Sequence, residues 1–183
     1  SWGDLDLDTD LDLVLANGGI PVTDLAGDAE PVQAFANLAA PGSATRFEGV
    51  GAAAGLTEVG PLLARGSAAA DYDNDGDLDI AVATVGGSLC LLENRAATGN
   101  WLEVELDGFH PGAVITASLP DGREVTRRLQ AGSSYLSSED PRAHFGLGET
   151  TEVGELVVTW PDGEVTTMDD VAANQILLVE PPA

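Results

Sequence analysis

Aspartates at alternate positions near the middle of the chain are the residues whose type and spacing point most directly to chemistry. Asp71, Asp73 and Asp75 recur at every second position, Gly76 permits a sharp turn, and Asp79 closes the loop. Ca²⁺ takes six to eight hard oxygen ligands, which carboxylates and main-chain carbonyls of a flexible loop can supply. This spacing therefore predicts a calcium-binding loop.

The start of this loop is similar to the Asp-x-Asp-x-Asp-Gly start of an EF-hand, but its end is different. Val82 stands where an EF-hand has its twelfth-position glutamate, and its side chain offers no oxygen. We therefore expect Asp79 to close the ligand ring, with the main-chain carbonyl of Asp77 as a further ligand. The apolar, β-rich residues that follow predict a strand in place of the EF-hand helix.

The same pattern occurs at the start of the chain, aligned without gaps. Thr9 replaces the loop glycine, where a β-branched residue is strained at positive φ, and Leu7 replaces Asn74. We predict a second, weaker site and hence one or two Ca²⁺ ions. The first-copy ligands would be the carboxylates of Asp4, Asp6, Asp8 and Asp12 and the carbonyl of Asp10.

A solvated acidic surface is the alternative to a metal site. Two unit charges 4 Å apart repel by roughly 4 kcal/mol at an effective dielectric of 20, and four carboxylates on one turn contain several such pairs. Ten of the 31 acidic residues lie in the two loops, and the other 21 (31 − 10) still outnumber the 7 basic ones. We expect both interpretations to hold: cation sites in the loops, and elsewhere an acidic surface typical of a halophilic or marine source. Mg²⁺ fits the loops less well, because it keeps more of its waters.

The overall charge excludes two classes of partner. A net charge of −24 repels nucleic acid and anionic lipid, which bind proteins through Lys and Arg. No stretch approaches the ~20 apolar residues of a membrane span. The sequence therefore predicts no nucleic-acid binding and no membrane insertion, while 44% hydrophobic residues are enough for a folded core.

Residues for catalysis are few. His110 and His144 are the two histidines, and for His144 a hydrogen-bonded structural role is expected. Cys90 lies in an apolar run and is expected to be a buried, inert thiol. No nucleophile elbow, phosphate loop, metalloprotease motif or cysteine pair is present. We therefore predict that the protein is not an enzyme.

Residues 1–97 are predicted to form one region of Asp-loop repeats, because each copy runs directly into an apolar strand. Repeats of this kind favour a propeller or solenoid, in which each unit packs on the next. A short helix is expected over 32–38. Further strands are expected over 46–50, 67–70 and 89–93.

Residues 98–183 are predicted to form a second domain, with a boundary near 96–100. Pro120-Asp121-Gly122 and Pro161-Asp162-Gly163 predict two hairpin turns. Short strands separated by such turns predict a small β-sandwich. The expected strands are 101–106, 113–119, 124–129, 155–160, 164–168 and 176–179. The fold class is therefore all-β: partial propeller-like blades with calcium loops, followed by a C-terminal sandwich.

The combination of these motifs resembles a known family. Residues 65–79, with the Asp loop at their end, are similar to the VCBS or FG-GAP-type repeats of integrin-like β-propellers. The stretch from Trp101 resembles the ASPIC/UnbV domain that follows such repeats in the cartilage acidic protein family and its bacterial relatives. The motifs that carry this second resemblance are Asn100-Trp101-Leu102, Gly132-Ser133-Ser134-Tyr135-Leu136-Ser137, His144-Phe145-Gly146-Leu147-Gly148, Trp160-Pro161-Asp162-Gly163 and Ala173-Asn174-Gln175.

The resemblance implies a secreted or cell-surface protein that binds calcium in propeller blades and acts in adhesion or recognition. The calcium ligands that it implies are the loop aspartates named above. Our leading hypothesis is a C-terminal fragment of an acidic extracellular protein, because the chain opens inside a repeat. It would bind a protein or glycan at the cell surface, or copies of itself.

Two alternatives stay open. In one, the chain is a subunit of an extracellular filament or surface layer, completed by strands from neighbouring copies. In the other, it is an enzyme, an accessory protein of a biosynthetic pathway, although no catalytic constellation in the sequence favours this.

Overall fold

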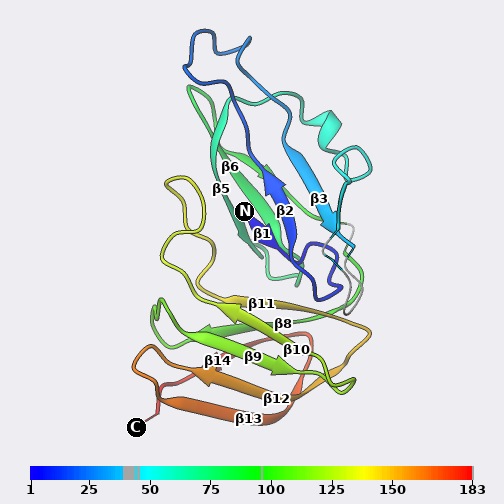
Figure 1. Ribbon diagram of the computed structural model, residues 1–183, viewed down its shortest axis with the longest axis vertical. Helices are drawn as coiled ribbons and strands as arrows, with labels where there is room; N and C mark the ends of the chain where they lie inside the picture. The colour runs from blue at the N-terminus through cyan, green and yellow to red at the C-terminus, as the bar shows by residue number, and fades with distance from the viewer. Residues whose placement is uncertain (39–43, 45, 96, 183) are drawn as a thin grey trace.

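Short strands make up nearly all of the regular structure in the computed structural model, which describes residues 1–38, 44, 46–95 and 97–182 (Figure 1). The protein is all-β, as predicted, and its described residues contain one short 3₁₀ helix, η1 (Leu56–Glu58). The strands before residue 97 are β1 (Trp2–Gly3), β2 (Asp12–Leu15), β3 (Gln33–Asn37), β4 (Phe47–Gly49), β5 (Ala64–Ala70), β6 (Asp79–Thr84) and β7 (Cys90–Leu92). Those after it are β8 (Asn100–Leu106), β9 (Val114–Ser118), β10 (Glu124–Arg128), β11 (Ala143–Gly148), β12 (Glu152–Thr159), β13 (Val165–Ala172) and β14 (Gln175–Val179).

The sequence repeat in the first half is also a structural repeat. Strands β1–β2–β3–β4 form one antiparallel sheet, and β5–β6–β7 form a second. In each sheet the aspartate that ends the Asp loop pairs with the residue that directly precedes the loop. Asp12 pairs with Gly3, and Asp79 pairs with Ala70. The two loops therefore join equivalent strands in the same register.

Two expectations for the first half are wrong in detail. Residues 32–38 do not form a helix, since β3 occupies Gln33–Asn37 and pairs with both β2 and β4. Sheet pairing on both sides outweighs the helix propensity of two alanines and a glutamine. Cys90 packs against the core but is half-buried, because β7 is an edge strand.

The second half encloses its own core between two sheets. One has the order β10–β9–β12–β13 and the other β11–β8–β14, in which β14 runs parallel to β8. Phe145, Leu102 and Ile115 are fully buried in one hydrophobic cluster that draws on both sheets. A separate cluster in the first half includes Val82 and Ile80.

The predicted turns of the second half are confirmed. Gly122 and Gly163 have φ values of 87° and 92°, which favour glycine, at the turns from β9 to β10 and from β12 to β13. The expected strands are present, although β12 begins before the predicted start at 155 and β13 runs past the predicted end at 168 to Ala172, whereas β11 was not predicted. The domain boundary near 96–100 stays a prediction, and residue 96 lies outside the described residues.

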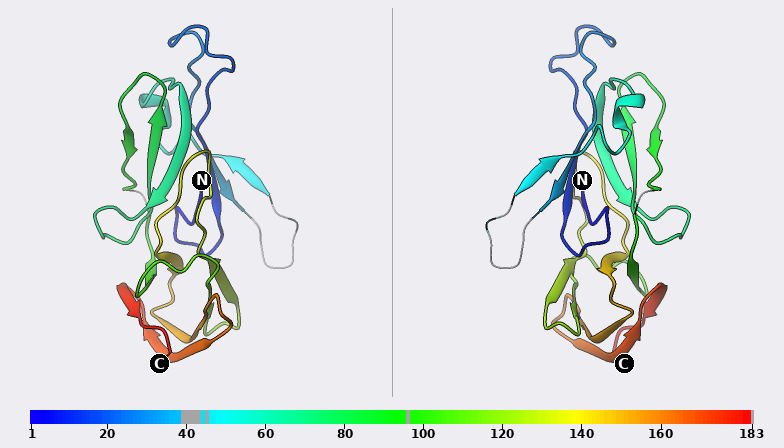
Figure 2. Two further views of the ribbon diagram at one scale, coloured as in Figure 1. Left: turned by 90° about the vertical axis from the view of Figure 1, so that its left-hand side faces the viewer. Right: turned by 90° about the vertical axis from the view of Figure 1, so that its right-hand side faces the viewer.

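The two halves meet at the Asp loops. In Figure 1 the loop between β1 and β2 reaches down toward β10 and β11, and Figure 2 shows both sheets of the first half standing next to each other above the second half. The segment between β10 and β11 reaches back to β5, where the main-chain N–H of Asp140 donates to the carbonyl of Ala69 at 3.2 Å.

Candidate metal centres

The loop between β5 and β6, called loop 2 here (residues 71–79), brings three of its predicted ligands together. Asp71, Asp73 and Asp79 each offer a carboxylate oxygen within 4.8 Å of the others. Gly76 has a φ of 100° and Asn74 a φ of 61°, and these two left-handed residues turn the chain around the carboxylates. Asp75 is not a member of this set: its Oδ1 accepts the main-chain N–H of Asp77 at 3.1 Å.

The loop between β1 and β2, called loop 1 (residues 4–12), has the same backbone course. Leu7 and Thr9 adopt φ values of 63° and 89°, at the positions of Asn74 and Gly76. Its set of converging carboxylates is Asp4, Asp6 and Asp8. Asp12 is outside that set, and the Asp10 side chain is partly exposed.

Equivalent hydrogen bonds hold the two loops. Oδ2 of Asp4 accepts the N–H of Thr9 at 2.9 Å, and Oδ2 of Asp71 accepts that of Gly76 at 2.9 Å. Each buried closing aspartate accepts from the second residue of its own loop: Asp12 from Leu5 at 2.9 Å and Asp79 from Tyr72 at 3.3 Å. The fold therefore builds a similar hydrogen-bonded cage twice, although Asp8 joins the converging carboxylates in loop 1 and Asp79 joins them in loop 2.

Two asparagines that the sequence prediction missed complete the cages. The main-chain N–H of Asn37 donates to Asp12 at 2.9 Å, and that of Asn94 donates to Asp79 at 2.7 Å. Each asparagine lies at or just after the end of the strand that returns beside the loop strand, β3 or β7. An asparagine closing the strand after each Asp loop was the available signal.

Two buried carboxylate oxygens in the loops have no hydrogen-bond partner among the described residues and are free to accept a cation. Asp4 is fully buried, and among the described residues its Oδ1 has no hydrogen-bond partner. The side chain of Asp77 is 8% exposed, and its Oδ1 is likewise unpartnered in that part of the chain. Leaving such atoms unpaired costs about 1–3 kcal/mol each, so donor chemistry and geometry both fit a bound divalent cation.

The electrostatics of the metal-free loops point the same way. Burial, reinforced by neighbouring aspartates, raises the pKa of Asp4 to about 7 and that of Asp6 to about 6. In loop 2, burial and then Asp75 raise the pKa of Asp77 to about 7, and burial raises those of Asp73 and Asp79. A cation would reverse these shifts by favouring the ionised carboxylates.

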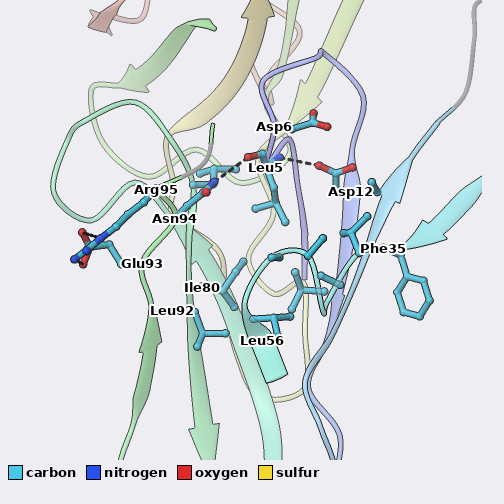
Figure 3. Close-up of a pocket in the computed structure, with 17 residues that line it drawn as sticks. Leu5, Asp6, Asp12, Phe35, Leu56, Ile80, Leu92, Glu93, Asn94 and Arg95 are labelled. Atoms are coloured by element: carbon cyan, nitrogen blue, oxygen red, sulfur yellow. Dashed lines mark hydrogen bonds and ion pairs between the residues drawn. The ribbon is translucent and has the colours of Figure 1, made fainter. Parts of the chain in front are cut away.

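An apolar cavity of about 500 Å³ adjoins loop 1, between the two sheets of the first half (Figure 3). Leu56, Ile80 and Leu92 line its walls, and Asp6 and Asp12 lie at one end. Figure 3 also shows the bond from the side-chain amide of Asn94 to the carbonyl of Leu5, 2.8 Å long, which ties the second repeat to loop 1.

His144 has the structural role expected of it. Its Nε2 lies 3.0 Å from the carbonyl oxygen of Gly76, and the side chain is 7% exposed. Burial lowers its pKa to about 4, so the imidazole is neutral at pH 7. It holds loop 2 against the second half.

Comparison with known proteins gives a family match for the second half of the chain. The family described as ASPIC and UnbV matches residues 94–183. These residues form an ASPIC/UnbV domain. Its core is the two-sheet cluster described above, and β11 carries the His-Phe-Gly-Leu-Gly motif singled out in the sequence.

The chain is also homologous to cartilage acidic protein 1. It is 34% identical over 119 residues to the protein of Xenopus tropicalis and 31% identical over 119 residues to that of Homo sapiens. Each match covers 61% of this chain and 18% of the relative, so the chain spans less than a fifth of the relatives' length. The mouse protein is 32% identical over 110 residues, which are 56% of this chain and 17% of the relative. No helix in the described ranges is long and apolar enough to cross a membrane.

Proposed function

We propose that the protein is a non-catalytic, calcium-binding extracellular module for binding, adhesion or scaffolding, in which the metals are structural. The observation that carries this proposal is that each of the two loops has its own cluster of converging carboxylates. Two loops of different sequence adopt the same course and each collects three carboxylates, although like charges repel. A bound Ca²⁺ in each loop would offset that repulsion.

The relatives support the extracellular part of the proposal. Their name, cartilage acidic protein, refers to cartilage and to acidity. This chain shares the acidity, with a net charge of −24. The partner we propose is a protein or glycan at the cell surface.

The finer architecture belongs to the same proposal. Sheets β1–β4 and β5–β7 would be two blades of a VCBS or FG-GAP-type propeller repeat, since each contains one Asp loop in the same register. The ASPIC/UnbV domain would be a small sandwich, with its core between two sheets.

Thermal unfolding in saturating CaCl₂ and in excess chelator, both at the same high KCl concentration, tests the metal sites. Ligand linkage predicts about 2.7 kcal/mol of stabilisation per site at one hundred times its dissociation constant. We expect the midpoint in calcium to lie several degrees above that in chelator. Fixed KCl matters, because screening of a −24 chain would otherwise imitate binding.

MgCl₂ at the same concentration is the control for divalent screening. A calcium-specific rise supports the structural sites. Equal midpoints in calcium, magnesium and chelator would show that the acidic loops serve solubility alone.

Self-assembly is a second candidate function, favoured by the edge strand β7. Leu91 on this strand is 45% exposed and the preceding Leu89 is 68% exposed, which leaves an apolar edge open to a further strand. Sizing chromatography with light scattering at high concentration, in calcium, distinguishes the two. Assemblies that form in the original chain and are lost in Leu91→Lys support a filament or surface layer. A monomer at every concentration contradicts it.

A further inference from the structure

Strand β11 of the ASPIC/UnbV domain lies between the two Asp loops and contacts both. On loop 2, Nη2 of Arg142 donates to the carbonyl of Asp71 at 2.6 Å, and its Nη1 donates to Oδ1 of Asn74 at 2.8 Å. His144 adds its bond to Gly76. Three positions of one loop are therefore held by Arg142, which directly precedes the strand, and by His144 near its start.

Loop 1 is held by the other end of the same strand. The main-chain N–H of Gly146 donates to Oδ2 of Asp4 at 3.1 Å, and that of Gly148 donates to the carbonyl of Leu7 at 2.8 Å. Arg127, on β10, donates to the carbonyl of Thr9 at 3.1 Å and lies 3.7 Å from Asp4. A main-chain bond to a loop carboxylate ties the domain directly to the cage.

Absent side chains allow this close approach. A Cβ on Gly146 would lie 2.3 Å from Oδ2 of Asp4, and one on Gly76 would lie 1.9 Å from Nε1 of Trp101. Away from the loops, a Cβ on Gly66 in β5 would meet the carbonyl of Tyr135 at 2.7 Å. Glycine is required at three points of the contact between the halves.

The arginine at the centre of the contact is itself fixed from the second half. Nη1 of Arg142 lies 2.6 Å from the buried carboxylate of Glu103 on β8, and Nη2 lies 2.7 Å from Asp140. These two carboxylates aim the guanidinium at loop 2. Burial, opposed by Arg142, raises the pKa of Glu103 to about 7.

We infer that the two Asp loops are the docking surface for the ASPIC/UnbV domain of the same chain, and that cation binding and docking are coupled. The inference rests on the proposed calcium binding. Without a cation, repulsion opens the loops and moves the atoms that Arg142 and Gly146 hold, namely the Asp71 carbonyl and the Asp4 carboxylate. Calcium therefore fixes the orientation of the two halves, and docking in turn tightens calcium binding, because linkage is reciprocal.

Small-angle X-ray scattering of the full chain, with saturating CaCl₂ and with excess chelator at equal KCl, tests whether calcium fixes the orientation of the two halves. We expect the radius of gyration to rise on chelation as the halves separate, and to return when calcium is restored. Calcium that binds without changing the scattering curve overturns the coupling and leaves the proposed function standing. No calcium binding at all overturns both.

Calorimetric titration of calcium into variants tests whether docking in turn tightens calcium binding. The direction of the change in calcium affinity decides the question. Arg142→Gln removes a positive charge beside loop 2, so electrostatics alone would strengthen cation binding. Coupling to docking predicts the reverse, about five-fold weaker binding or more. Arg46→Gln is the matched control, since Arg46 is 68% exposed and pairs with Glu48.

Gly66→Ala gives a test that leaves every charge in place and does not depend on the folding of Arg142→Gln. Gly66 is five residues before Asp71, roughly 16 Å away along a strand, so the added methyl separates the halves without touching a ligand. Gly154→Ala on β12 is the control, because its Cβ would make an ordinary 3.5 Å contact. Weaker calcium binding in Gly66→Ala than in Gly154→Ala supports the inference, and equal affinities overturn it.

Discussion

At the scale of residues, each Asp loop divides its carboxylates between two tasks. Asp71 and Asp79 are buried and accept main-chain N–H groups, whereas Asp73 is exposed and converges with them. In loop 1 Asp4 is buried and Asp6 is exposed in the same way, although Asp6 also accepts the main-chain N–H of Asp8 at 3.3 Å. Substitution of a buried aspartate should therefore damage the loop itself, while substitution of an exposed one should affect cation binding alone.

Asp71→Asn and Asp73→Asn should separate these two tasks. Both should lose the calcium-dependent rise of one site, because an amide is a poorer ligand than a carboxylate. Asp71→Asn should in addition cost about 1–3 kcal/mol in chelator, since its amide NH₂ would face one of the N–H groups of Asp75 and Gly76. Denaturant unfolding with and without calcium measures both effects.

Asp107→Asn is the control for these variants, because Asp107 is exposed and lies outside the loops. It should leave both the metal-free stability and the calcium response unchanged. Equal calcium responses in Asp73→Asn and Asp107→Asn would contradict the assignment of Asp73 as a ligand.

The metal-free protein should lose stability as pH rises from about 4 to 7. Asp4, Asp77 and Glu103 have folded pKa values of about 7 and Asp6 of about 6, all above their ordinary values of 3.8 and 4.5. The folded state therefore holds protons that the unfolded chain has released, and loses that advantage as pH rises through these folded pKa values.

His144 opposes this trend. Its pKa of about 4 lies below the ordinary 6.5, so its own contribution to stability rises over the same interval. Four carboxyl groups against one imidazole leave a net fall. Thermal midpoints in chelator at pH 5, 6 and 7 check this. The rise in the thermal midpoint that calcium causes should also be larger at pH 7.5 than at pH 5. A calcium effect independent of pH would contradict the part assigned to the carboxylates.

At the scale of elements, a loop and a strand from different halves of the chain are fitted to each other. Trp101 on β8 lies directly over Gly76 of loop 2, and β11 lies against both loops. Loop 2 is therefore positioned from two sides: by β5 and β6 within its own sheet, and by β8 and β11 of the ASPIC/UnbV domain.

Gly76→Ala and Gly122→Ala form a matched pair for this contact. Both glycines have positive φ, 100° and 87°, so either alanine costs about 1–2 kcal/mol of backbone strain. A Cβ at Gly122 meets no atom within 4 Å, whereas one at Gly76 collides with the Trp101 indole. Gly76→Ala should lose more stability in denaturant unfolding and should shift the tryptophan emission to longer wavelength. Equal losses would show that backbone strain accounts for the whole effect.

At the scale of the whole molecule, the net charge of −24 opposes folding through general repulsion. Raising KCl from 0.1 M to 1 M shortens the screening length from about 10 Å to about 3 Å. In chelator the thermal midpoint should therefore rise smoothly with KCl, and calcium should add its effect at far lower concentration. A thermal midpoint independent of KCl would show that general repulsion between the acidic residues does not limit the stability of the protein.

Much of this fold and site could be predicted because the signals are local. Alternating aspartates before an apolar strand, and Pro-Asp-Gly turns between strands, identify both loops and both hairpins without knowledge of the rest of the chain. Proximity in the chain also explains why the loop aspartates form sets: Asp71, Asp73 and Asp79 lie within nine residues. Local propensity failed at 32–38, where pairing with two distant strands decided for β3.

The sequence by itself determined the all-β class, the two Asp loops, the acidity and the resemblance of the second half to ASPIC/UnbV. Tertiary structure alone decided what surrounds the loops. Asn94 donates a hydrogen bond to Asp79, and Arg142 donates one to Asp71. Gly146 donates one to Asp4, which lies 142 residues away in the chain. The contacts of Arg142 and Gly146 depend on the docking of one half on the other, and a long-range contact leaves no periodic pattern in a single sequence. The physical reason is that side-chain spacing encodes local conformation, whereas packing between distant segments is a property of the folded chain.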